Sequence, residues 1–346
     1  MHRTLEEVDV QGYLNHAADF TSEEQALRNE FALWLPKEII DAHAHCGRPE
    51  HVLAIPERAY NHMLSTFPYF TLEQSKKWHE LLHPGINFRS LRFAKTFRGI
   101  AHKLVNEYLL SDSPEQDRIA VYGLPDEPGY TIAMLQHERT SALKMYYSYL
   151  EPPATEIFQY FPDPVLEIAQ QKGIPIILHP PAKITKCLGQ LELLFAKFPR
   201  LKVCIAHLGL TKFPIPGLAE AYRLVARFPG AVMDTSMVPS AEVVAMALKI
   251  LGPSRILYGS DEPLNLIRAS SYEHPKLGQR LMADHPYHWL DRTEQAEHRS
   301  KVESITLAHW QCLQALRTAI ERLPAEQQSA AKQAVFHDNA ARFFGF

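Results

Sequence analysis

Apolar and polar positions alternate in blocks along residues 118–263. Short apolar runs such as "RIAVYGLP" (118–125) and "IPIILHPP" (174–181) are followed by longer segments in which apolar residues recur at helical spacing. A nearly continuous apolar run is typical of a parallel strand that is buried on both faces, and amphipathic helices cover such a sheet. The alternation therefore predicts βαβ units around a parallel sheet.

Seven strands are predicted from the apolar runs, at residues 37–45, 118–125, 141–150, 174–181, 201–209, 231–237 and 255–263. Helices are expected between the later strands, and Gly173 ends one of them because glycine adopts the left-handed conformation easily. An eighth strand, the second in chain order, is expected within residues 46–115.

Three segments surround these units within a single predicted domain, residues 1–346. Residues 1–36 are expected to form a helical extension, in which Thr21 and Glu24 have the spacing of a capping box and Pro36 ends the helix. Residues 46–115 are expected to be a mostly helical insertion that covers the end of the first strand like a lid. Residues 290–346 are expected to form a helical tail.

Two architectures contain such units, the open doubly wound sheet and the closed (β/α)₈ barrel. The open sheet that binds dinucleotides has a G-x-G-x-x-G turn after its first strand, and "AHCGRPEH" lacks that pattern. We therefore predict an α/β fold, a (β/α)₈ TIM barrel with an N-terminal helical extension, a long insertion after the first strand and a C-terminal helical tail.

Composition excludes several classes of partner. The formal net charge is −3, without the basic stripe expected of a protein that binds nucleic acid or an acidic membrane. No apolar run approaches the roughly 18 residues of a membrane helix, and no secretory signal is recognised at the N-terminus. The four cysteines form no C-x-x-C pair. Reduced thiols and a cytoplasmic location are expected.

The stretch "EIIDAHAHCG" places Asp41, His43 and His45 at every second position of the first predicted strand. A strand has a period of two, so these polar side chains are expected on one face, where burial without partners would be costly. The chain contains 18 histidines, and at that frequency about one H-x-H pair arises by chance. The pair therefore needs support from other positions.

Polar residues also follow the apolar runs of later strands, namely Lys144, His179, His207, Asp234 and Asp261. The successive separations from His179 to His207, to Asp234 and to Asp261 are 28, 27 and 27 positions, about the length of one βα unit. In a barrel the carboxyl ends of all strands meet at one mouth. Several imidazoles and a carboxylate at one mouth suit a divalent metal such as zinc.

The sequence resembles the amidohydrolase superfamily, in particular the amidohydrolase-related branch that also contains metal-dependent decarboxylases. The resemblance rests on "DAHAH", "PIILHPP", "PRLKVCIAHLG", "GPSRILYGSDEP" and "VFHDNAARFFGF", and covers residues 38–45 and 117–265 and the tail. It implies that a divalent metal, zinc above all, is held by His43, His45, His179 and Asp261. It also implies that His207 is either a ligand of a second metal or the catalytic acid–base.

Lys144 separates two kinds of site that the resemblance allows. "SALKMYYSYL" looks like the strand that in dihydropyrimidinase-like members carries a carboxylated lysine bridging two metals. In the alternative, Lys144 is an ordinary amine that anchors a substrate carboxylate. The number of metals, one or two, stays open at this point.

The predicted mechanism follows from the ligand types. A metal with an open position lowers the pKa of a bound water to about 7. Asp261 is expected to take the proton of that water and pass it to the leaving group, and His207 to stabilise the developing oxyanion or serve as the acid. Asp41 is expected to orient a ligand imidazole. Asp234 either belongs to the site or caps the following helix.

Several other residues have weaker signals. Glu262 stands where the family often has an aromatic residue, and is expected to add a carboxylate near the mouth. The basic residues Arg89, Arg92, Lys95 and Arg98 are expected on a solvated helix face, with contact to an anionic substrate as the alternative. Cys46 is expected to be a buried thiol, and His274 to lie outside the mouth.

Three functions remain, in decreasing order of preference. The first is a metal-dependent hydrolase of an amide, lactone or ester bond in a small molecule. The second is a metal-dependent non-oxidative decarboxylase of an aromatic or unsaturated acid, and the third is a non-enzymatic barrel used for binding. The expected partner is a small-molecule substrate, and a homodimer is the base-rate expectation.

Overall fold

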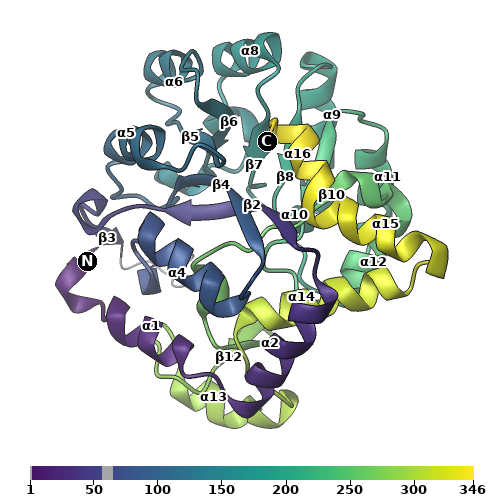
Figure 1. Cartoon of the computed structure of the whole chain (residues 1–346). Coiled ribbons are helices and arrows are strands. Elements are labelled where there is room, and N and C mark those ends of the chain that lie inside the picture. The colour runs from purple at the N-terminus through teal and green to yellow at the C-terminus, as the bar shows by residue number, and fades with distance from the viewer. Residues whose placement is uncertain (1, 57–64) are drawn as a thin grey trace.

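The computed structural model describes residues 2–56 and 65–346, so that residues 57–64 of the predicted insertion, and Met1, lie outside the described part (Figure 1). Eight parallel strands form the central sheet. In order of pairing they are β2 (Glu38–Cys46), β4 (Asn87–Ala94), β5 (Arg118–Tyr122), β6 (Thr140–Met145), β7 (Ile176–Leu178), β8 (Val203–Ile205), β9 (Ala231–Asp234) and β10 (Ile256–Leu257). The seven predicted strands are present, although most end earlier than expected.

Backbone hydrogen bonds between β2 and the segment after β10 close the sheet into a barrel. The amide of Ala42 donates to the carbonyl of Tyr258 (3.0 Å), and that of His45 donates to the carbonyl of Glu262 (2.9 Å). The amide of Asp261 donates to the carbonyl of His43 (2.9 Å). The predicted (β/α)₈ barrel is therefore confirmed, and the open sheet is excluded.

Apolar side chains from all eight strands fill the barrel interior. The cluster comprises Ile40, Ala42, Leu91, Phe93, Ala120, Ala142, Ile177, Cys204, Val232 and Leu257, joined by Ala340 and Phe344 of the tail. A packed interior leaves no channel through the barrel. The mouth formed by the carboxyl ends of the strands is therefore the part of the barrel that can hold a ligand.

Helices surround the barrel, as the amphipathic segments predict. They are α5 (His102–Asp112), α6 (Pro128–Met134), α7 (Ile157–Tyr160), α8 (Asp163–Lys172), α9 (Leu188–Lys197), α11 (Leu218–Ala226) and α12 (Ala241–Leu251). The short segment α10 (His207–Leu210) is a left-handed turn instead. The expected end of α8 is confirmed, because Gly173 follows it with φ of 67°.

The N-terminal extension forms α1 (Val10–Ala18) and α2 (Ser22–Trp34), at the opposite edge of the view from α6 and α8 (Figure 1). The predicted capping box is present, with Glu24 N donating to Thr21 Oγ1 (3.2 Å) and Thr21 N donating to Glu24 (2.9 Å). Glu24 is fully buried and also pairs with Arg268 (2.7 Å). This ion pair fastens the extension to the segment that follows the last barrel strand.

The described part of the insertion contains α4 (Leu72–Leu82), β4 and α5, and a short strand β3 (Ile55–Pro56) that pairs with β1 (His2–Arg3). The hidden second barrel strand is thus β4. The expected solvated helix face is wrong, because Arg92 lies within this strand and Lys95 directly follows it, both buried. Arg92 remains charged in the interior because Asp117 (2.5 Å) and Glu262 (3.4 Å) pair with it.

After the last barrel strand the chain forms a hairpin that the sequence analysis did not predict. Its strands are β11 (Ser270–His274) and β12 (Gly278–Met282). The helical tail follows as α13 (Arg292–His298), α14 (Ala308–Glu321), α15 (Ala325–Gln333) and α16 (Asn339–Phe344). Within the described ranges, no helix has the length and apolar character needed to cross a bilayer.

Candidate metal centre

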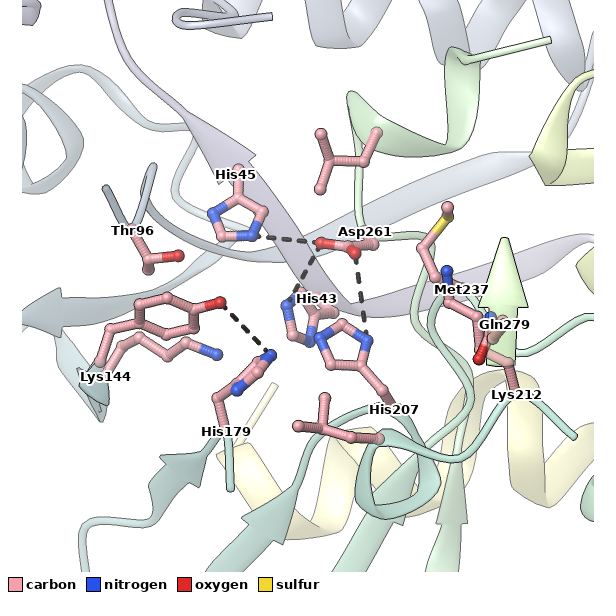
Figure 2. A pocket seen from close by; sticks show the side chains of 13 residues that line it. His43, His45, Thr96, Lys144, His179, His207, Lys212, Met237, Asp261 and Gln279 are labelled. Atoms are coloured by element: carbon pink, nitrogen blue, oxygen red, sulfur yellow. Dashed lines mark hydrogen bonds and ion pairs between the residues drawn. The ribbon is translucent and has the colours of Figure 1, made fainter. Parts of the chain in front are cut away.

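The six residues predicted for the site lie around one cavity of ≈ 250 Å³ at the mouth of the barrel (Figure 2). They are His43, His45, Lys144, His179, His207 and Asp261. The remaining lining residues are Thr96, Tyr146, Leu210, Lys212, Met237, Leu264 and Gln279. The ring of Phe93 packs against two of the histidines, with its centroid 5.0 Å from that of His43 and 4.7 Å from that of His45.

Each of the four imidazoles has its Nδ1 next to an acceptor oxygen. Nδ1 of His43 faces Asp234 Oδ2 (3.0 Å), and that of His45 faces the carbonyl of Ala94 (2.9 Å). Likewise, Nδ1 of His179 faces the carbonyl of Pro180 (3.0 Å) and Nδ1 of His207 faces the carbonyl of Ser236 (2.9 Å). Because an oxygen without a proton can only accept, these contacts place the ring proton on Nδ1 and leave each Nε2 as an acceptor, the tautomer of a metal-binding histidine.

Asp261 turns its carboxylate toward these acceptor nitrogens. Its Oδ1 lies 3.2 Å from Nε2 of His45 and 3.5 Å from Nε2 of His43. In the described part of the chain this buried oxygen has no hydrogen-bond donor. Three facing acceptors repel one another unless a cation lies between them, so the residues present fit a divalent metal.

The protonation states agree with this assignment. Burial lowers the pKa of His45 to about 3 and moves that of His179 well below its usual range, so both rings are neutral at pH 7. Burial alone would raise the pKa of Asp261, but the imidazoles of His43, His45 and His207 hold it below its usual value. Neutral imidazoles and an ionised carboxylate are the forms that bind metals. His43, His207 and Asp261 offer ligand atoms that all lie within 4.8 Å of one another.

A left-handed turn presents His207 to the cavity. Four successive residues have positive φ: His207 (56°), Leu208 (45°), Gly209 (76°) and Leu210 (59°). Asp261 also has positive φ (62°). Non-glycine residues in this region carry strain of roughly 1–3 kcal/mol each and cluster at functional sites. The two elements that bear His207 and Asp261 are thus bent sharply into the mouth.

Replacement of Gly209 tests how much this turn contributes to the stability of the fold. A Cβ at Gly209 would lie 2.5 Å from Cβ of Ile184, so Gly209→Ala is expected to lower the free energy of unfolding by about 1–3 kcal/mol through overpacking. Gly189→Ala is the control, because no atom lies within 4 Å of the added Cβ and α9 tolerates alanine. Urea denaturation of both variants measures the difference. Equal stability of the two would contradict the prediction.

Lys144 lies at the end of β6 and is buried, with Nζ 5.1 Å from the ring centroid of Phe93. Burial lowers the pKa of Lys144 to about 8. Carboxylation requires the neutral amine, which such a pKa makes accessible, whereas the contact with Phe93 suits the ammonium form. Both forms of Lys144 considered from the sequence remain compatible with its position.

The expectation for Asp41 is wrong, because Asp234, and not Asp41, contacts a candidate ligand imidazole. Asp41 accepts hydrogen bonds from the amides of His43 (2.9 Å) and Ser260 (2.9 Å) and from the hydroxyl of Ser260, and contacts no imidazole. It therefore joins the backbone of β2 to the segment after β10. Asp234 contacts the ring of His43, and its Oδ1 accepts from the amide of His207 (2.9 Å).

Three further expectations concern neighbouring residues. Glu262 is not among the cavity-lining residues and pairs instead with His79 (3.0 Å) and Arg92, so its expected place near the mouth is wrong. Cys46 is a buried thiol, as expected, and accepts a hydrogen bond from Arg92 (3.2 Å). His274 lies on β11, where its Nδ1 accepts from the amide of Lys276 (3.0 Å), and does not line the cavity.

Four polar lining residues were missed by the sequence analysis: Thr96, Tyr146, Lys212 and Gln279. The Tyr146 hydroxyl lies 3.4 Å from Nε2 of His179. Thr96 and Tyr146 directly follow barrel strands β4 and β6, and that position is a signal that could have identified them.

Comparison with known proteins identifies the family of the chain. The sequence model of the family described as Amidohydrolase matches residues 124–346, more than half of the chain. The chain belongs to this amidohydrolase family. No curated protein matches its sequence.

Solved structures with low sequence identity share the fold. A 5-carboxyvanillate decarboxylase from Sphingomonas paucimobilis matches with a TM-score of 0.53 and 14% identity, over 90% of this chain and 100% of that one. A putative 2-pyrone-4,6-dicarboxylic acid hydrolase from Pseudomonas putida matches with 0.52 and 17%, over 90% and 98%. An amidohydrolase from Burkholderia multivorans with bound zinc matches with 0.54 and 14%, over 89% and 99%. At such low identities, these matches show that the three proteins share the barrel fold of this chain and nothing further.

Proposed function

We propose that this amidohydrolase is a metal-dependent hydrolase that cleaves an amide, lactone or ester bond of a small molecule. The observation that carries the proposal is the arrangement of Asp261 Oδ1 opposite the unprotonated Nε2 atoms of His43 and His45. The fixed tautomers of all four imidazoles support it. We assign the whole chain, residues 1–346, to this one catalytic domain.

In this proposal His43, His45, His179 and Asp261 hold the metal, and His207 is either a ligand of a second metal or the acid–base. We favour zinc, which suits nitrogen and carboxylate ligands and is bound by the Burkholderia multivorans protein. When bound, zinc supplies a Lewis acid that lowers the pKa of water to about 7 and polarises a carbonyl.

Two side chains then move protons. Asp261 accepts the proton of the attacking water and delivers it to the leaving nitrogen or oxygen, for which its burial beside the imidazoles positions it. His207 has Nδ1 fixed on the carbonyl of Ser236, so its Nε2 is free to hold a proton near the developing oxyanion. The separation of 4.0 Å between Asp261 Oδ2 and His207 Nδ1 keeps the two groups at one reacting centre.

The second candidate is a metal-dependent decarboxylase of an aromatic or unsaturated acid. Lys144 and Lys212 favour it, because two ammonium groups at the cavity suit an acidic substrate. The decarboxylase from Sphingomonas paucimobilis has the same fold.

Oxygen-18 water distinguishes the two reactions. The zinc-reconstituted protein is incubated with amides, lactones, esters and aromatic acids in labelled water, and products are analysed by mass spectrometry. A hydrolase incorporates one label into the product acid. Release of carbon dioxide from an aromatic acid without such incorporation would replace the hydrolase by the decarboxylase.

Metal content tests the role of Lys144. We expect one zinc per chain, because the described residues contain a single cluster of metal-binding geometry, and Lys144→Met is expected to keep that zinc. Elemental analysis of both proteins, prepared with excess zinc and bicarbonate, measures the ratio. Two ions in the unchanged protein and one in Lys144→Met would instead establish a bridging carboxylated lysine.

A further inference from the structure

Lys212 is a cationic side chain in the cavity wall that the proposed mechanism does not use. It follows the left-handed turn of α10 and lines the cavity together with Gln279 of the β11–β12 hairpin. In Figure 2, Lys212 and Gln279 lie to one side of Asp261, whereas Lys144 and His179 lie to the other. Lys212 therefore lies on the opposite side of Asp261 from Lys144.

Lys212 is half-buried, and within residues 2–56 and 65–346 its ammonium forms no hydrogen bond or ion pair. Burial lowers its pKa. A partly desolvated cation without a contacting counter-ion is unfavourable, and an anion that enters the cavity reduces that penalty. Asp261, the one carboxylate among the described residues that line the cavity, is directed at the imidazoles, and its charge acts on Lys212 without a direct contact.

The charged side chains around the cavity also favour an anionic ligand. Two ammonium groups, Lys144 and Lys212, face a single carboxylate, and a divalent metal would add further positive charge. A cavity lined by one sign of charge attracts ligands of the other sign. Leu210, Met237 and Leu264 supply apolar wall between the polar groups, so the body of the ligand is apolar.

We propose that Lys212 binds a carboxylate of the substrate at a point remote from the bond that reacts, with Gln279 as an additional hydrogen-bond donor. The substrate class is then a small organic acid with an apolar body, and Lys212 determines specificity without taking part in the chemical step. This inference rests on the proposed function for the identity of the site, but it concerns binding and is testable without turnover.

Matched mono- and dicarboxylates test the inference on the full zinc-loaded chain. Isothermal titration calorimetry compares benzoate with isophthalate and butyrate with glutarate, so that each pair differs by one carboxylate. In the unchanged protein the dicarboxylate is expected to bind about tenfold more tightly, the factor of one charge-assisted hydrogen bond. Lys212→Gln is expected to reduce this ratio to near one and leave the affinity for the monocarboxylate unchanged.

Two further variants serve as controls. Lys212→Arg keeps the charge and is expected to retain most of the ratio. Lys249→Gln removes an exposed lysine of α12 and is expected to change nothing. Melting temperatures of all variants establish that each is folded.

A ratio near one in the unchanged protein, for both pairs, would overturn the inference. A ratio that persists in Lys212→Gln would overturn it too, because another group would then bind the second carboxylate. Failure of the proposed function has a different signature, namely absence of bound zinc or of turnover while the ratio still depends on Lys212.

Discussion

Asp261→Ala is expected to lose its bound metal and to lower turnover by about 10²–10³-fold or more, the effect of removing a preorganised electrostatic group. Among residues 2–56 and 65–346, Asp261 is the one carboxylate that faces Nε2 of both His43 and His45, at 3.5 and 3.2 Å. Without it the remaining candidate ligands are three neutral imidazoles, none of which carries negative charge to offset that of a divalent cation. His43→Ala is expected to behave in the same way. Elemental analysis and initial rates measure both effects.

A substitution away from the cavity is the control for these variants. Asp126 is an exposed carboxylate in the turn after β5, and Asp126→Ala is expected to retain metal and activity. Circular dichroism of the Asp261 and His43 variants should match that of the unchanged protein. Activity that persists in both variants after purification with chelator would refute the assignment of the site.

Asp234→Asn is expected to weaken metal binding, and with it turnover, by about 10–100-fold. Asp234 Oδ2 accepts the Nδ1 proton of His43 (3.0 Å), which keeps Nε2 unprotonated. An amide nitrogen at that place would donate to Nδ1 and drive the ring proton to Nε2, where it would oppose a metal. Competition with a fluorescent zinc chelator measures the affinity.

Asp41→Asn is the matched control for that variant. Asp41 is also fully buried, but it binds the backbone amides of His43 and Ser260 and no imidazole. Its replacement is expected to lower the melting temperature and leave zinc affinity within a few-fold. Equal loss of zinc affinity in the two variants would show that Asp234 acts through the general integrity of the barrel and not through the tautomer of His43.

The sequence predicted most of the barrel because its strands are apolar on both faces. The exception is β4, "NFRSLRFA", whose pattern is interrupted by Arg89, Ser90 and Arg92. Arg92 is tolerated in the interior because it pairs with Asp117 and Glu262, which are distant in sequence. A charge that is compensated by distant residues cannot be distinguished, from the sequence, from a charge on a solvated helix.

The candidate ligands were predictable because they share one phase of successive βα units, and the cavity brings them together. Asp41 was misjudged because a strict period of two places it on the face of His43 and His45. The pairing of β2 with β4 shifts register between Asp41 and Ala44, which breaks that period. Lys212 and Gln279 come from a loop and a hairpin, whose course depends on tertiary packing.

The junction that closes the barrel also sets the dimensions of the candidate centre. The carbonyl of His43 accepts the amide of Asp261, so two residues whose side chains face the cavity are joined through their main chains. Any change in this junction would therefore alter the spacing of the two side chains, whatever rotamers they adopt. Closure of the barrel and the spacing of two candidate ligands are thus linked through one of its three closing main-chain hydrogen bonds.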